Sequence, residues 1–150
     1  MTALHQHFLK LALKEAQKAA LKEEVPVGAV IVHEGKVIAR AHNLKEAKQD
    51  CIAHAEILAL QKAMKKRKDW RLSDCTLYVT LEPCPMCAGA ILHARLKAVY
   101  FGALDPKWGG TGSVTNLFEM PFNHRLDYQF IPTPECSQIL TQFFKAKRKK

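Results

Sequence analysis

Hydrophobic residues in the first third of the chain change from helical to strand spacing. In residues 3–23, Leu and Ala recur at helical intervals among Lys, Gln and Glu, which predicts an amphipathic helix. Residues 25–32 form a β-branched apolar run, and residues 36–42 alternate apolar with polar side chains. The Glu34–Gly35 pair between these segments predicts a tight turn, so we expect a helix followed by a β-hairpin.

The rest of the chain alternates between strand and helix patterns. We expect strands at residues 76–81, 98–101 and 126–130, helices at residues 54–68, 84–94 and 134–147, a polar loop at residues 43–50 and a Gly-rich loop at residues 105–113. This order predicts an α/β fold in which helices flank a mixed sheet of about five strands. No repeat or linker interrupts the pattern, so residues 1–150 are expected to form a single domain with a basic helical tail at about residues 134–150.

Composition and length fit one globular domain without disulfides. Of the 150 residues, 48% are hydrophobic and 25% are charged, a balance that argues against a disordered chain. No apolar run approaches the roughly 20 residues that span a bilayer, and the N-terminal segment does not resemble a signal peptide. The five cysteines are an odd number, which makes a disulfide framework a poor interpretation. We therefore expect a cytoplasmic protein without a membrane partner.

Positive charge is the compositional feature that bears on partners. The formal net charge is +9, and basic residues cluster at positions 65–68 and 145–150. Such an excess favours polyanionic partners, nucleic acid among them. Solvated helix ends would give the same clusters, so charge alone leaves both interpretations open.

Two short motifs place metal-binding side chains at the starts of two predicted helices. His54 and Glu56 open one helix, and Cys84 and Cys87 open the next. Because residues three apart share a helix face and a helix N-terminus favours thiolates, the two sulfurs can bind one ion. With His54 they form a three-ligand set for Zn²⁺, whose fourth position stays open to water as in catalytic zinc sites.

Glu56 has the chemistry and the position of a proton carrier. It lies two residues after His54, near the ion but on another face of the helix, so it is poorly placed as a ligand. A carboxylate there can take a proton from water and return it to a leaving group. Other interpretations are a redox Cys pair, half of a zinc knuckle, a structural zinc site completed by Cys51 or Cys75, and a buried His54 without a ligand role. The combination of His-x-Glu with Cys-x-x-Cys favours catalytic zinc.

Six segments spread over nearly the whole chain match the pattern of a known family. They are VPVGAVIV at residues 25–32, AHAEI at 53–57, TLYVTLEPCPMCAGAI at 76–91, VYFGALDPKWGGTGS at 99–113, NHR at 123–125 and the tail ECSQILTQFFKAKRK. In these segments the chain resembles the bacterial tRNA-specific adenosine deaminases (TadA type) of the cytidine deaminase superfamily. The central block is shared with guanine deaminases, so it indicates the chemistry better than the substrate.

The resemblance implies a three-layer α/β/α cytidine-deaminase-like fold and a homodimer. It also implies hydrolytic deamination of adenosine to inosine at the wobble position of a tRNA anticodon, in bacteria usually that of an arginine tRNA. The partner would be the tRNA anticodon stem–loop, whose unpaired bases can be splayed out for chemistry. One Zn²⁺ per subunit would be the cofactor.

The same resemblance assigns roles to individual residues. His54, Cys84 and Cys87 match the zinc ligands, and Glu56 matches the proton shuttle. The positions that match substrate or RNA contacts are Asn43, Asp105, Lys107 and Phe144. Each of these four has a plainer alternative, as a turn residue, a solvated cation or a packing aromatic.

The sequence leaves two alternative functions open. One is the same chemistry on guanine or another free nucleobase or nucleoside, against which the basic tail argues because a free base carries no phosphate. The other is a non-catalytic RNA-binding protein with a structural zinc, against which the presence of Glu56 argues.

The chain departs from the family pattern in three places. Trp108 stands in the Gly-rich loop where a small residue is usual, and it could stack on a base or pack at a subunit interface. Cys51 replaces a residue that is often proline and raises the question of an alternative ligand. The segment at residues 131–134 is richer in proline than is typical, which affects only the start of the last helix.

Overall fold

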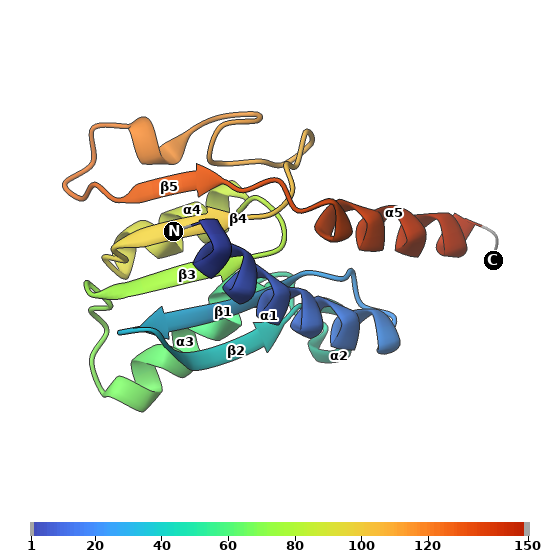
Figure 1. Ribbon diagram of the computed structural model, residues 1–150, viewed down its shortest axis with the longest axis horizontal. Helices are drawn as coiled ribbons and strands as arrows, with labels where there is room; N and C mark the ends of the chain where they lie inside the picture. Colours follow the sequence, from blue (N-terminus) through green and yellow to red (C-terminus); the bar gives the residue numbers. More distant parts are fainter. Residues whose placement is uncertain (1, 149–150) are drawn as a thin grey trace.

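Five strands form one mixed sheet in the computed structural model, which describes residues 2–148 (Figure 1). The strands are β1 (Gly28–His33), β2 (Lys36–His42), β3 (Cys75–Val79), β4 (Ala98–Phe101) and β5 (Asp127–Phe130). Their order across the sheet is β2-β1-β3-β4-β5. Strand β1 is antiparallel to both β2 and β3, whereas β3, β4 and β5 run parallel. The expected five-stranded mixed sheet is therefore confirmed.

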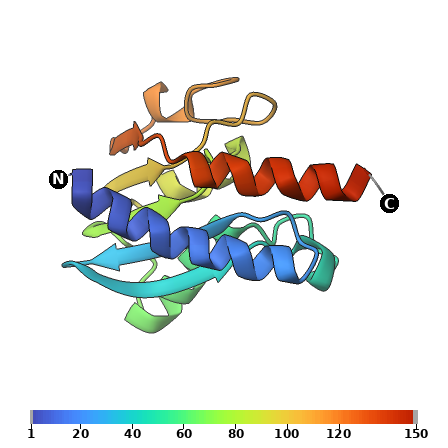
Figure 2. The same cartoon turned by 45° about the vertical axis from the view of Figure 1, so that its right-hand side comes forward.

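Helices cover both faces of this sheet and complete three layers. They are α1 (Thr2–Leu21), α2 (Lys45–Lys48), α3 (Ala55–Arg67), α4 (Pro85–His93) and α5 (Pro134–Arg148), with a short 3₁₀ helix, η1 (Leu117–Glu119). Helices α1 and α5 lie side by side over one face, and α3 and α4 lie behind the other (Figures 1 and 2). The predicted α/β/α architecture is confirmed, and of the expected basic tail only residues 149 and 150 lie outside the described part of the chain. No helix within residues 2–148 is both long and apolar enough to cross a membrane.

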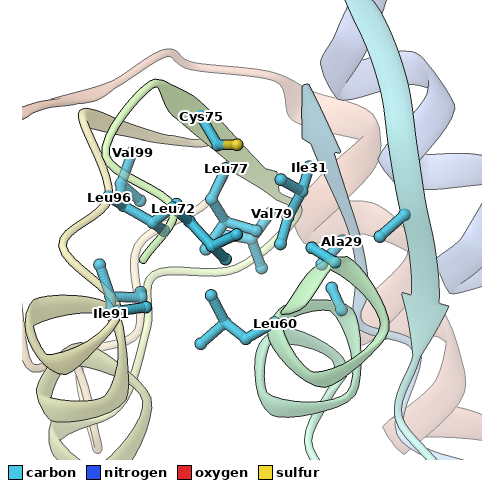
Figure 3. Close-up of a cluster of buried hydrophobic side chains, with 14 of the residues drawn as sticks. Ala29, Ile31, Leu60, Leu72, Cys75, Leu77, Val79, Ile91, Leu96 and Val99 are labelled. Carbon is cyan, nitrogen blue, oxygen red and sulfur yellow. The ribbon is translucent and has the colours of Figure 1, made fainter. Parts of the chain in front are cut away.

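Alternation along the central strands builds two separate cores. On β1, Ile31 packs with α3 and α4, whereas Val30 packs under α1. On β3, Leu77 and Tyr78 divide between the same two faces. This follows from the period of two along a strand, and because both faces are covered, both positions of each pair are apolar. Figure 3 shows the larger core, in which Leu60 and Ile91 from the helices meet the strand residues.

Helix α1 packs onto β1 without an intervening side chain. A Cβ atom at Gly28 would collide with the α1 backbone at Ala12 and Ala16. The backbone N–H of Gly28 donates to Thr80 Oγ1 at 3.1 Å, which ties this point to the end of β3. A glycine is therefore required here for close helix–strand approach.

The structure corrects the expected bounds of several elements. Strand β1 begins at Gly28 rather than Val25, because Pro26 has no N–H for a ladder and Val27 N–H turns back to Val25 O at 2.9 Å. The predicted strand at residues 76–81 is Cys75–Val79, and α1 ends at Leu21 rather than at residue 23. The Glu34–Gly35 turn is confirmed, with positive φ at both residues as a type I′ turn requires.

The loop expected at residues 43–50 contains the short helix α2. The backbone N–H groups of its second and third residues, Glu46 and Ala47, donate to the two carboxylate oxygens of Glu24 at 2.9 and 2.7 Å. Glu24 is 1% exposed, so a buried carboxylate from the segment that follows α1 caps this helix. Helix η1 was likewise not predicted; its start is capped by Asn116, which accepts from Phe118 N–H.

Candidate active site

Three candidate metal ligands meet where α3 and α4 begin. His54 and Cys84 are the residues just before the two helices, and Cys87 lies in the first turn of α4. His54 Nδ1 is 3.7 Å from Cys84 Sγ and 3.5 Å from Cys87 Sγ. A tetrahedral Zn²⁺ with ordinary bond lengths places nitrogen and sulfur ligands about 3.6 Å apart. The three donors therefore fit zinc in chemistry and in spacing.

Neither of the other cysteines considered as a fourth ligand joins this group. Within residues 2–148, His54, Cys84 and Cys87 form the complete cluster of metal-ligating side chains, all within 4.8 Å of one another. Cys51 lines the same cavity but lies outside the cluster. Cys75 is buried on β3, where Arg67 donates to its sulfur at 3.0 Å. Three protein donors leave one position of a tetrahedral ion open, which suits a catalytic rather than a structural site.

The pKa values of the two thiols, Cys84 and Cys87, shift in opposite directions. A hydrogen bond from Cys87 lowers the pKa of Cys84 to about 4; burial opposes this shift, and His54 reinforces it. The pKa of Cys87 is correspondingly raised, first by its hydrogen bond to Cys84 and then by burial. The hydrogen bond with Cys84 also raises the pKa of His54, against the effect of burial. Metal binding at this site would therefore displace protons.

Glu56 lies beside the three donors and is almost completely buried, at 4% exposure. Burial raises the pKa of its carboxyl group to about 7, and the nearby Cys84 adds to the shift. It occupies the first turn of α3, two residues after His54 in the chain. The structure thus places a carboxyl group within the site but outside the metal-ligating cluster.

A cavity of about 450 Å³ opens onto these residues. Its volume falls in the range of roughly 300–1,000 Å³ that is typical of small-molecule sites. Its lining comes from the segment before β1, the α2 region, the start of α3, the stretch from the end of β3 to the start of α4, and the loop after β4. The residues concerned are Val25, Val27, Asn43, Lys45, Cys51, His54, Ala55, Glu56, Leu81, Glu82, Cys84, Pro85, Met86, Asp105 and Trp108.

Asn43 combines a position in the cavity wall with a structural role. Its side chain accepts from Lys45 N–H at 3.1 Å and donates to Val25 O at 3.2 Å. These bonds hold the segment before β1 against the start of α2. The contact and turn interpretations of Asn43 are therefore compatible.

Asp105 also lines the cavity while organising its own loop. Its Oδ1 accepts from the backbone N–H groups of Lys107 at 3.0 Å and Trp108 at 3.1 Å. Trp108 contributes to the lining, whereas Lys107 is exposed and lies outside it. Of the two residues predicted from this loop, the structure brings only Asp105 to the cavity.

Glu82 is a site residue that the sequence reasoning missed. It is 2% exposed, and its carboxylate accepts from the backbone N–H groups of Asp105, Thr111 and Ser113 at 3.0 to 3.1 Å. Burial alone would raise the pKa of Glu82, but these bonds and one from the Ser113 hydroxyl lower it below its usual value. Its only sequence signal is an acidic residue directly before the Pro-Cys motif.

Phe144 lies on α5, away from the cavity lining. It is 46% exposed and meets Phe143 edge-to-face, with ring centroids 5.4 Å apart. Lys145, Lys147 and Arg148 follow in the last turn. The structure therefore groups Phe144 with an exposed basic helix end and not with the candidate metal site.

Comparisons with known proteins agree with this fold. The sequence profile of the MafB19-like deaminases matches residues 3–148. A tRNA-specific adenosine deaminase of Bacillus subtilis (strain 168) is 52% identical over 145 residues, covering 95% of this chain and 90% of the relative. A solved structure from work on A-to-I editing by tRNA:A34 deaminases at the wobble position of transfer RNA superposes with a TM-score of 0.87 and 44% identity, covering 90% of this chain and 99% of that one. A guanine deaminase from Bacillus subtilis has a TM-score of 0.66 and 36% identity, covering 97% of this chain and 94% of that one.

A mixed sheet of this order, with His, Glu and two Cys at the starts of its inner helices, defines the cytidine-deaminase-like class. The chain belongs to the MafB19-like deaminase family, among the relatives named tRNA-specific adenosine deaminases. The family resemblance seen in the sequence is therefore confirmed.

Proposed function

We propose that this protein is a zinc-dependent tRNA adenosine deaminase that converts adenosine to inosine at position 34, the wobble position, of an arginine tRNA, consuming water and releasing ammonia. The observation that carries the proposal is the structural comparison: this chain superposes on the tRNA:A34 deaminase structure with a TM-score of 0.87 and on the guanine deaminase structure with a TM-score of 0.66. The relatives with high identity over nearly the full chain are named for the same reaction.

His54, Cys84 and Cys87 would hold the ion. Bound zinc supplies one thing to the reaction, the activation of a water molecule at neutral pH. Glu56 supplies the proton transfers: it takes a proton from the attacking water and delivers it to N1 of the adenine as oxygen adds to C6. It then takes the second proton from the hydroxyl group now on C6 and passes it to the amino group, which leaves as ammonia while C6 becomes a carbonyl carbon. The burial of Glu56 in the cavity beside the donors, outside the metal cluster, supports this role.

Asn43 is proposed to contact the target nucleotide. Its NH₂ group has two hydrogens, and within residues 2–148 one of them donates to Val25 O. The second hydrogen is available to an acceptor inside the cavity. Because the bonds to Val25 and Lys45 fix the amide, this donor is oriented before a substrate enters.

The exposed basic residues near the cavity and at the end of α5 are proposed to bind the anticodon stem–loop. An unpaired loop suits a cavity-type active site because its bases can leave the stack without breaking a duplex. Lys107 is exposed on the loop that borders the cavity, and Lys145, Lys147 and Arg148 end α5. We assign phosphate contacts to these cations and an RNA-loop contact to Phe144. The net charge of +9 supports a polyanionic substrate.

We also propose that the protein is a homodimer that acts in the cytoplasm. The segment between β4 and β5 carries four exposed apolar side chains: Leu104, Val114, Met120 and Phe122. Exposed apolar groups of this kind mark protein–protein contacts. All five cysteines are free thiols, which suits a reducing compartment.

The decisive experiment compares tRNA with free bases as substrates. The zinc-loaded protein is incubated with transcribed arginine tRNA and, separately, with guanine, cytidine and adenosine. We expect inosine at position 34 of the tRNA and no turnover of the small molecules. The alternative, a free-nucleobase deaminase, is favoured by the likeness to the guanine deaminase structure. Turnover of guanine without inosine in the tRNA would establish that alternative and contradict the proposal.

A further inference from the structure

Trp108 is a large apolar side chain left in solvent at the rim of the active-site cavity. It is 68% exposed although it contributes to the cavity lining. It is also the largest of the lining residues. An exposed indole offers a flat face that gains free energy when another ring covers it.

The backbone that carries Trp108 is held in place, so the indole is anchored at a defined point on the cavity rim. The Trp108 N–H donates to Asp105 Oδ1 at 3.1 Å, and the next residue, Gly109, donates to Asp105 O at 2.9 Å. A Cβ at Gly109 would collide with the carboxylate of Glu82, so the loop lies directly on that buried group. These contacts hold the loop backbone without a ligand, so binding at the indole needs no ordering of the loop backbone.

We propose that Trp108 is a stacking residue for the unpaired base adjacent to the target nucleotide. This inference rests on the proposed RNA substrate and adds to it the residue that binds the neighbouring base. The target base enters the cavity, while the indole at the rim meets the next ring along the strand. Lys45 in the lining and Lys107 beside Trp108 provide cations for the phosphates that join the two nucleotides.

Stacking on an aromatic side chain is tolerant of base identity because every base has a π face, and it contributes substantially to the binding of single strands. The contribution requires a neighbouring base, so it is absent for a free nucleoside. Trp108 thus favours an oligonucleotide over its isolated target nucleoside. The other occupant that an exposed indole suits is a second copy of the chain, and the experiment below separates the two.

The test is a double-mutant cycle between Trp108 and the neighbouring base. Stem–loop RNAs are made with the intact anticodon or with an abasic nucleotide on one or the other side of the target. For the intact RNA, Trp108→Leu is expected to raise KM by roughly 5- to 150-fold with little change in kcat, and Trp108→Phe to restore most of the loss. For one of the abasic RNAs, wild type and Trp108→Leu should have the same KM. Equal losses with all three RNAs would overturn the proposal.

Fluorescence gives a second readout that does not depend on turnover. The chain has two tryptophans. Trp70 is 50% exposed, lies outside the cavity lining and stacks with Arg71, so it is replaced to leave Trp108 as the one fluorescent indole. In Trp70→Phe protein, binding of the intact stem–loop should quench the remaining indole, and binding of the relevant abasic RNA should not. A change of oligomeric state in Trp108→Leu, with unchanged KM, would assign the indole to a subunit contact and overturn the proposal. If the wild type makes no inosine, the proposed function fails; if it does and the Trp108 variants match it, only the stacking role fails.

Discussion

The carboxylate of Glu82 accepts a hydrogen bond from the backbone N–H of Asp105, which comes 23 residues later in the chain, at 3.1 Å. Thr111 and Ser113 donate to the same carboxylate from the other end of the loop. One buried charge therefore holds both ends of the segment that carries Asp105 and Trp108 to the cavity. The loop after β4 therefore brings residues to the cavity because Glu82, from the segment between β3 and α4, holds it there.

Glu82→Gln should release this loop. Each Glu82 oxygen faces at least two donors, so the NH₂ group of glutamine must point at a donor in either orientation. We expect the free energy of unfolding to fall by about 1–3 kcal/mol, and KM for the RNA to rise. Urea unfolding and steady-state kinetics measure the two effects. Glu119→Gln is the control and should change neither, because Glu119 is exposed and a glutamine oxygen can still accept from the Tyr128 hydroxyl.

The stability difference between wild type and Glu82→Gln should depend on pH. The pKa of Glu82 is lowered in the folded protein relative to its usual value of 4.5. Its contribution is therefore complete above pH 4.5 and is lost as pH falls through the lower folded value. Unfolding free energies measured at neutral pH and at successive pH values below 4.5 should converge. A difference that stays constant with pH would contradict the electrostatic role of Glu82.

Glu56→Gln should separate metal binding from proton transfer. The substitution keeps the shape of the side chain and removes its ability to accept a proton, so the deamination rate should fall about 10²- to 10⁴-fold. Zinc content and RNA affinity should stay at wild-type levels, because Glu56 is outside the cluster of donors. Full activity of this variant would instead support a non-catalytic RNA-binding protein, and loss of zinc would make Glu56 a ligand.

Cysteine substitutions should distinguish ligands from neighbours. Cys87→Ala removes one of the three donors, and we expect zinc affinity to fall by more than the roughly 10- to 100-fold that loss of an outer-shell partner costs. Cys51→Ala is the matched control, since Cys51 lines the same cavity outside the donor cluster. Metal analysis after dialysis measures both. Equal zinc loss in the two variants would show that Cys51 binds the ion.

Light scattering should show a particle of twice the 16.9 kDa mass of one chain. The physical reason is the set of exposed apolar side chains at Leu104, Val114, Met120 and Phe122, which a partner subunit would cover. The measurement is made at micromolar concentration with and without RNA. A single monomeric species under both conditions would refute the proposed homodimer.

Most of the fold could be predicted because its elements have local signals. A β-branched apolar run marked β1, two-residue alternation marked β2, and Glu34–Gly35 marked the turn between them. Helix α2 could not be predicted, because its cap is the carboxylate of Glu24, which lies 22 residues before Glu46 in the chain. The early start assigned to β1 was wrong because hydrophobicity does not report the missing N–H of Pro26.

The candidate site divides in the same way. The spacing of His54, Cys84 and Cys87 predicted one cluster, and the structure brings the three side chains together. Glu82 was missed because its partners come 23 to 31 residues later, and no local pattern links them. Phe144 was assigned from resemblance, and its position outside the cavity leaves an RNA contact on α5 as a prediction.

The ion pair between Arg67 and Asp74 should stabilise the protein at neutral pH without affecting catalysis. The guanidinium donates to both carboxylate oxygens, at 2.6 and 3.3 Å, and lowers the pKa of Asp74 from 3.8 to about 2. Its contribution is present above pH 3.8 and disappears as pH falls toward 2. Because the Asp74 side chain is 53% exposed, solvent screening keeps the effect of Asp74→Asn near 0.2–1 kcal/mol. Urea unfolding at successive pH values should show the unfolding free energies of wild type and Asp74→Asn converging in acid. Asp69→Asn is the control: it removes the more exposed pair with Arg71, and its unfolding free energy should differ little from that of wild type at every pH. A gap that persists at the acid end would show that Asp74 stabilises the fold by packing rather than by charge.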